Sequence, residues 1–143
     1  MKAVFMREHG DSSVLEYGEF EDPKPANGEV LLKIKASSLN RLDIYTRIGM
    51  RGTKLPEDRF PHILGGDTSG DIIAVGEGVS SDRIGQRVVV NPMLAIKPRP
   101  VMLGSQRLGS YAELVAVPES SLVIIPDHLS YQQAAALPTV YLP

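Results

Sequence analysis

The sequence predicts a mainly β domain, built as a partly open antiparallel β-barrel with a few short helices. Three observations lead to this prediction. The 143 residues fit one compact domain. Apolar residues fall in short strand-like runs, and glycine and proline, 13 and 11 in number, separate those runs. Short strands at this spacing, with glycine at the corners, are typical of small antiparallel barrels.

The elements follow from local patterns. Strands are expected at 2–6, 14–19, 29–37, 71–76, 86–91, 114–117 and 122–125. Within 29–37, apolar Val30, Leu32, Ile34 and Ala36 occupy every second position, which suits a strand with one buried face. Residues 42–48 are expected to form a helix of about two turns that ends at Gly49. In this helix Asn40 would lie near the N-cap and Asp43 in the first turn, where the helix dipole favours a carboxylate.

Two later segments complete the pattern. Residues 92–109 show little apolar periodicity and are interpreted as an exposed loop or a hairpin arm used in oligomer contacts. The alternative is that Lys97, Arg99 and Arg107 in this segment meet a cofactor phosphate. Near the end of the chain, Ser130 is a good N-cap and Gln133 completes a capping box, so a helix is expected to begin there.

Composition excludes several classes of function. A hydrophobic content of 43% with 22% charged residues is ordinary for a globular domain, and a net charge of −2 gives no reason to expect nucleic acid or an anionic membrane as partner. No apolar stretch approaches the length of a membrane span, and the N-terminal residues lack a signal-peptide core. The absence of cysteine excludes disulfides, cysteine-ligated zinc and a cysteine nucleophile.

Motif searches add further exclusions. The glycines around Gly76 and Gly78 lack the third glycine and the following helix of a dinucleotide fingerprint. No serine-hydrolase elbow occurs in register. His9, His62 and His128 are isolated and are interpreted as surface or loop histidines, so the sequence calls for no metal.

Two segments, 36–49 and 64–79, resemble the N-terminal GroES-like domain of the medium-chain dehydrogenase/reductase superfamily. In the zinc alcohol dehydrogenases of that superfamily the first segment carries a ligand cysteine and the second a Gly-His-Glu. This chain has Asn40 at the cysteine position, with Gly66 and Asp67 at the histidine and glutamate positions. An Asn amide is a poor zinc ligand and glycine offers no side chain. The resemblance therefore implies the zinc-free, quinone oxidoreductase-like branch.

The same resemblance implies the site residues. Asn40, Asp43, Tyr45 and Arg47 match the branch's Asn-x-x-Asp-x-Tyr-x-Arg pattern beside the nicotinamide and substrate cleft. It implies Asn40 and Tyr45 as catalytic, because amide and hydroxyl donors can stabilise charge on a substrate carbonyl without a metal. Asp43, Arg47, Asp67 and Thr68 would line the cleft. For three of these a structural role is also open: Asp43 as a helix cap, Arg47 as a salt-bridging surface residue, and Asp67 as a turn cap or the partner of an arginine.

The resemblance also implies the setting. Residues 1–128 would form the GroES-like substrate domain, and 129–143 the start of a connection to a Rossmann domain that binds NADP or NAD. Hydride would pass to a quinone, an enone or a similar activated carbonyl compound. We expect a cytoplasmic homo-oligomer that acts on a small molecule without zinc, and expect this chain alone to be inactive. The alternatives are a freestanding GroES-like binding or assembly module and, less favoured, a zinc alcohol dehydrogenase with substituted ligands.

Overall fold

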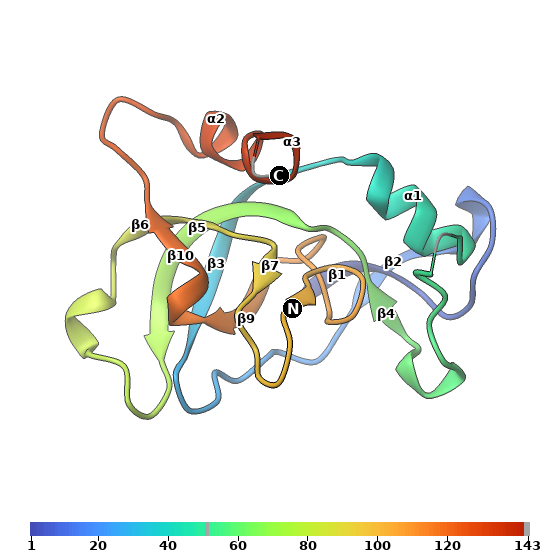
Figure 1. Cartoon of the computed structure of the whole chain (residues 1–143), viewed down its shortest axis with the longest axis horizontal. Helices are drawn as coiled ribbons and strands as arrows, with labels where there is room; N and C mark the ends of the chain where they lie inside the picture. Colours follow the sequence, from blue (N-terminus) through green and yellow to red (C-terminus); the bar gives the residue numbers. More distant parts are fainter. Residues whose placement is uncertain (51, 142–143) are drawn as a thin grey trace.

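The chain folds into antiparallel sheets with short helices at their edges (Figure 1), in a computed structural model that describes residues 1–50 and 52–141. The strands within these residues are β1 (Lys2–Met6), β2 (Leu15–Glu19), β3 (Glu29–Ser38), β4 (His62–Ile63), β5 (Asp67–Val75), β6 (Arg87–Val90), β7 (Met93–Leu94), β8 (Val101–Met102), β9 (Leu114–Pro118) and β10 (Leu122–Ile124). The helices are α1 (Arg41–Ile48), α2 (Tyr131–Ala135) and α3 (Pro138–Tyr141). Single 3-10 turns lie at Ser12–Val14, Glu57–Arg59, Ser81–Arg83 and Glu119–Ser121.

The strands pair into a five-stranded sheet of order β10-β6-β5-β3-β9, a three-stranded sheet of order β2-β1-β4, and the hairpin β7–β8. The pairings between these strands are antiparallel. The long β3 pairs with β5 on one side and β9 on the other, and its ladder with β5 shifts register twice. Such bulges bend a strand. The sheets do not close, which confirms the predicted mainly β, partly open antiparallel barrel.

The main core lies between the five-stranded sheet and the hairpin. It contains Val30, Leu32, Ile72, Val88, Val90, Leu94, Leu103, Val115 and Val117. Two smaller clusters lie under the three-stranded sheet, formed by Ala3, Phe5 and Ile63 and by Met6, Leu55 and Leu64. Tyr111 packs against both of these clusters. The predicted alternation in β3 is confirmed, because Val30 and Leu32 are fully buried while Lys33 and Lys35 are exposed.

Strand β5 begins at Asp67, four residues before its predicted start. Its first residues pair with the end of β3, Asp67 with Ser38 and Thr68 with Ser37. The prediction of a turn at residues 67–70 was wrong. This polar, glycine-rich segment forms a strand because β3 provides its hydrogen-bonding partner. A Cβ at Gly70 would lie 2.3 Å from the Lys33 carbonyl oxygen, so this glycine permits the close approach of β3.

Two further predictions need correction. Residues 92–109 do form a hairpin, but they are not simply exposed, since Leu94 and Leu103 are 0% and 1% exposed and belong to the main core. His62 was expected on the surface, yet it is 3% exposed in β4 and its Nε2 lies 3.2 Å from the Gly104 carbonyl oxygen. His62 is buried because β4 pairs with β1 and the segment around Gly104 lies against the imidazole ring. His128 is exposed, as predicted.

The predicted start of α2 is confirmed, because the Ser130 hydroxyl accepts from the Gln133 N–H and the Gln133 side chain accepts from the Ser130 N–H. Helix α2 lies against β3, β5 and β6 (Figure 1). The Tyr131 hydroxyl donates to Asp71 of β5, and the Arg87 guanidinium stands 4.6 Å from the Tyr131 ring centre. The last part of the predicted connection, residues 142 and 143, lies outside the described residues.

Candidate functional site

The N-terminus of α1 is built by the residues that the sequence singled out. Asn40 has extended backbone angles, and its side-chain oxygen accepts from the Leu42 N–H at 3.2 Å. The Asp43 carboxylate returns the contact by accepting from the Asn40 N–H at 2.8 Å. The predicted cap at Asn40 and the C-terminal residue Gly49, at φ 70°, are both confirmed. Since the cap uses the amide oxygen, the amide N–H groups of Asn40 are left as donors.

Asp43 joins three parts of the chain. Besides the Asn40 N–H, its carboxylate accepts from the Tyr111 hydroxyl at 2.7 Å and from the Gly65 N–H at 3.2 Å. The residue is 9% exposed, and this burial raises the pKa of its carboxyl although the three hydrogen bonds act in the opposite direction. Burial, followed by the bond to Asp43, raises the pKa of Tyr111 as well. Asp43 therefore fixes the start of α1 to the β4–β5 link and to Tyr111.

A cavity of about 360 Å³ lies beside this junction. It is lined by Leu15, Leu39, Asn40, Arg41, Asp43, Ile44, Arg47, Leu64 and Tyr111. The positions of Asn40, Asp43 and Arg47 are three and four residues apart, so they share one face of α1. The structure thus brings three of the predicted site residues together around one mostly apolar cavity.

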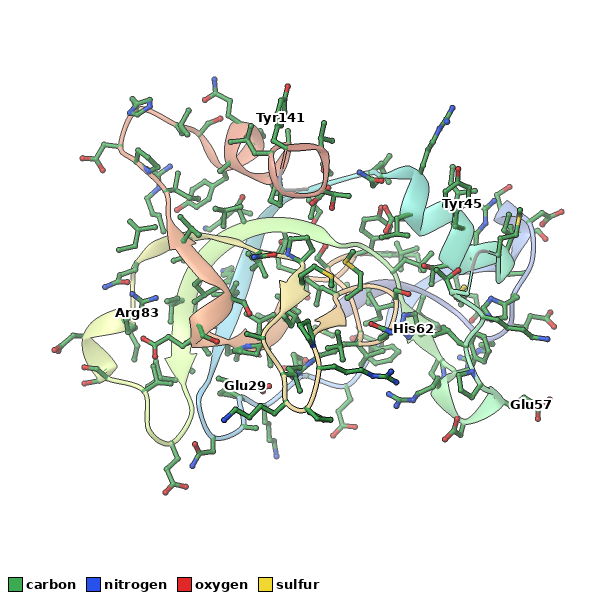
Figure 2. The ribbon with its side chains drawn as sticks, in the orientation of Figure 1. Glu29, Tyr45, Glu57, His62, Arg83 and Tyr141 are labelled. Atoms are coloured by element: carbon green, nitrogen blue, oxygen red, sulfur yellow. The ribbon has the colours of Figure 1, made fainter. Side chains whose placement is uncertain are left out.

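Tyr45 and Arg47 differ in their surroundings. Tyr45 does not line that cavity; Figure 2 places it at the upper side of the molecule, the side on which Tyr141 of α3 also lies. The Arg47 guanidinium Nε donates to the Gly10 carbonyl oxygen at 3.3 Å, and the Arg47 carbonyl accepts from the Gly10 N–H. Arg47 is half-buried and holds the loop after β1, and the described residues form no salt bridge with it.

Asp67 and Thr68 lie below the surface, at the start of β5. Asp67 is 0% exposed, and one carboxylate oxygen accepts from the Thr139 N–H at 2.9 Å and the Thr139 hydroxyl at 2.6 Å. The other oxygen accepts from the Ser38 hydroxyl at 3.1 Å. The expected turn cap or arginine partner was wrong, because among the described residues the partners are hydroxyl and N–H groups of β3 and α3. Thr68, also 0% exposed, donates to the Ala36 carbonyl at 3.2 Å.

Gly65 and Gly66 differ in their constraints. Gly65 has a φ of 102°, and a Cβ there would lie 2.7 Å from the Ser110 and Tyr111 side chains, so tight geometry explains this glycine. Gly66 has no positive φ, and a Cβ would meet nothing closer than 3.4 Å. Steric crowding therefore does not explain why position 66 is a glycine.

Sequence reasoning did not identify Tyr111 as a functional candidate. Tyr111 lies in a bend before β9, and its hydroxyl reaches Asp43 across 68 positions of sequence. In the sequence, this residue is visible as a tyrosine that follows Gly109 and Ser110. No neighbouring residue indicates that its hydrogen-bond partner is Asp43.

Comparison with known proteins fits this architecture. Residues 26–127 match the alcohol dehydrogenase GroES-like domain. The chain is 32% identical over 136 residues to a quinone oxidoreductase of Pseudomonas aeruginosa, covering 95% of this chain and 37% of that protein. Among solved structures, the quinone oxidoreductase from Coxiella burnetii superposes with a TM-score of 0.85 at 30% identity, covering 99% of this chain and 42% of that one. An NAD-dependent alcohol dehydrogenase gives a TM-score of 0.86 at 40% identity, covering 96% and 43%.

The fold and the match together define the class: an antiparallel GroES-like domain of the medium-chain dehydrogenase/reductase type. This chain belongs to the alcohol dehydrogenase GroES-like domain family. It spans about 37% of the length of the quinone oxidoreductase it matches. None of the helices in the described part of the chain is both long and apolar enough to cross a membrane.

Proposed function

We propose that this chain forms the substrate domain of a zinc-independent, NAD(P)H-dependent reductase that transfers hydride to a quinone, enone or similar activated carbonyl compound. The observation that carries the proposal is the cap of α1. Its geometry uses the oxygen of Asn40 and leaves the amide donors beside a mostly apolar cavity. The quinone oxidoreductases to which the chain is similar support the substrate class.

The zinc of the alcohol dehydrogenases does not fit the residues present. The oxygen of Asn40 is occupied by the Leu42 N–H, Gly66 has no side chain, and both oxygens of Asp67 accept from Ser38 or Thr139. Within residues 1–50 and 52–141, no three His, Asp or Glu side chains are grouped to hold a metal. The chemistry proposed for this chain therefore does not use zinc.

The chemistry assigned to this chain is the stabilisation of charge. Bound NAD(P)H would supply a hydride, two electrons and one proton, to the substrate carbon. Negative charge then develops on the conjugated carbonyl oxygen, and the Asn40 amide donates a hydrogen bond to it. Water supplies the proton that completes the reduced product, or Tyr45 supplies it by reaching the substrate from outside the cavity lining.

The other predicted residues are assigned supporting roles. Asp43 positions Asn40 through the Asn40 N–H, and Arg47 forms one wall of the cavity. Asp67 and Thr68 are buried, so we propose that they support the cleft from beneath rather than touch the substrate. The cytoplasmic location and the homo-oligomeric state remain predictions.

We further propose the division into a substrate domain, 1–128, and a connection, 129–143, to a cofactor domain. Apolar side chains near the connection support it, since Leu39, Val140 and Tyr141 are 85%, 66% and 71% exposed. Large apolar side chains grouped at one end of a domain suit a surface that another domain covers.

The test is NADPH-dependent reduction of p-benzoquinone, followed by the loss of NADPH absorbance. We expect no turnover by the 143-residue chain and turnover by the product of its whole reading frame. In that longer protein, Asn40→Ser keeps a cap oxygen but removes the amide, and should lower kcat by about 10²–10³ with unchanged thermal stability. An unchanged kcat in Asn40→Ser would show that the Asn40 amide does not stabilise the developing charge. Enzyme-like turnover by the 143-residue chain would refute the need for a second domain.

The alternative, a freestanding binding or assembly module, gives a different result. A reading frame that ends at Pro143 and a protein without reductase activity would favour it.

A further inference from the structure

A groove of about 600 Å³ separates segment 52–62 from residues 99–108 of the hairpin region. It shares no lining residue with the cavity beside α1. Its volume lies within the range of small-molecule sites, about 300–1,000 Å³. The groove is therefore a second candidate site, separate from the one assigned to the reductase.

Positive charge is concentrated in this groove. Lys54, Arg59, Arg99 and Arg107 line it, and Asp58 is the one acidic residue that the described lining contains. The whole chain, in contrast, has a net charge of −2. Figure 2 shows Glu57, a neighbouring acid, pointing outward and away from His62 at the groove. Such local charge raises the concentration of anions at a cleft.

The four cations are not equally available. Arg107 is held by Glu29, with 2.8 Å between the guanidinium Nη2 and the carboxylate. In the described part of the chain, Lys54, Arg59 and Arg99 form no ion pair or side-chain hydrogen bond, and all three are exposed. Arg59 and Arg99 line the groove from two separate segments, one after α1 and the other within the hairpin region.

The deep part of the groove is polar. His62 and Ser105 line it and are 3% and 5% exposed. Because a carbonyl oxygen only accepts, the His62 Nε2–H donates to Gly104, and in the neutral ring Nδ1 is left as an acceptor. Burial lowers the pKa of His62, and the charge of Arg59 lowers it further. An anion bound beside Arg59 would offset that repulsion.

We propose that this groove binds the phosphate groups of a small phosphorylated ligand, with Arg59 and Arg99 as the main contacts from its two lining segments. The planar guanidinium group matches phosphate oxygens with paired hydrogen bonds, and two such groups lining one groove suit a pair of phosphates. The ligand is either a nucleotide or a phosphate ester without a nucleoside. The site goes beyond hydride transfer, and it does not depend on the reductase assignment.

The test uses the 143-residue chain, with inorganic pyrophosphate as the probe in calorimetry and in ¹H–¹⁵N spectra. Saturable binding is expected, with amide shifts confined to 52–62 and 99–108. Arg59→Gln and Arg99→Gln should each weaken binding about tenfold, the loss of one charge-assisted contact. Lys97→Gln, on the same hairpin but outside the groove lining, is the matched control and should leave binding unchanged.

A second readout separates a built site from general charge attraction. At a pyrophosphate concentration that saturates only the wild-type chain, the pKa of His62 should rise in the wild type and rise less in Arg59→Gln. ADP binding tighter than pyrophosphate identifies a nucleotide ligand, and weaker binding identifies a phosphate ester without a nucleoside. The proposal is overturned if binding is not saturable, or if Lys97→Gln weakens it as much as Arg99→Gln. Thermal unfolding of each variant verifies that these exposed substitutions leave the fold intact.

Discussion

Replacing Tyr111 by phenylalanine isolates one hydrogen bond of the α1 junction. The ring remains between the two small core clusters, and only the hydroxyl that donates to Asp43 at 2.7 Å is removed. Asp43 is 9% exposed, so water replaces the lost donor poorly. A hydrogen bond to a charged group contributes about 1.5–3 kcal/mol, and we expect Tyr111→Phe to lower the free energy of unfolding by about that amount at pH 7.

The pH dependence distinguishes this bond from a packing effect. Burial raises the pKa of Asp43, so the ionised carboxylate is the unfavourable form in the folded chain, and stability from this group increases as pH falls through that pKa. The lost donor matters most to the ionised carboxylate, so the difference between Tyr111→Phe and wild type should shrink at acidic pH. Urea unfolding at neutral and acidic pH measures both values. Tyr141→Phe, 71% exposed, is the control. A neutral-pH loss below about 0.5 kcal/mol, or one independent of pH, refutes the reasoning.

Three further predictions concern other sites. Burial lowers the pKa of His62, so the free energy of unfolding should fall as pH drops below the unfolded value of about 6.5, and His62→Gln should reduce that slope in urea titrations. Gly70→Ala places a Cβ 2.3 Å from a β3 carbonyl oxygen and should cost more than about 2 kcal/mol, whereas at Gly18 the nearest atom is 3.7 Å away and alanine should cost less. Asn40→Cys with Gly66→His supplies two zinc ligands where at least three are needed, so metal analysis should find less than one zinc per chain; stoichiometric zinc would contradict this.

The parts of the site that depend on local sequence were predictable. Helix α1 is capped by a reciprocal hydrogen-bond pair between Asn40 and Asp43 and ends at Gly49. These features, like the Ser130 cap of α2, depend on residues only a few positions apart. Capping bonds form between neighbours in the chain, so the residue types alone indicate them. The fold class was predictable for a related reason, since strand length and corner residues are local properties.

The parts that depend on distant neighbours were not predictable. The partners of Asp67 are Ser38 and Thr139, which lie 29 and 72 positions away. The burial of His62 depends on the hairpin residues around Gly104. A strand such as the start of β5, rich in Gly, Ser and Thr, has weak intrinsic preference and forms because β3 supplies its ladder.

Among the described residues, the two buried carboxylates at the edge of this site have no cationic partner and accept from neutral donors. Asp43 is satisfied by two backbone N–H groups and a phenol, and Asp67 by one N–H and two hydroxyls. A buried charge without such donors costs several kcal/mol, so these bonds specify where α1 and α3 meet the sheet. Asp43 joins the start of α1 to the link before β5, and Asp67 joins the start of α3 to β5. The same hydrogen bonds therefore hold Asn40 and Gly65 at Asp43 and hold Thr139 at Asp67, and they occupy carboxylate oxygens that a metal would otherwise require.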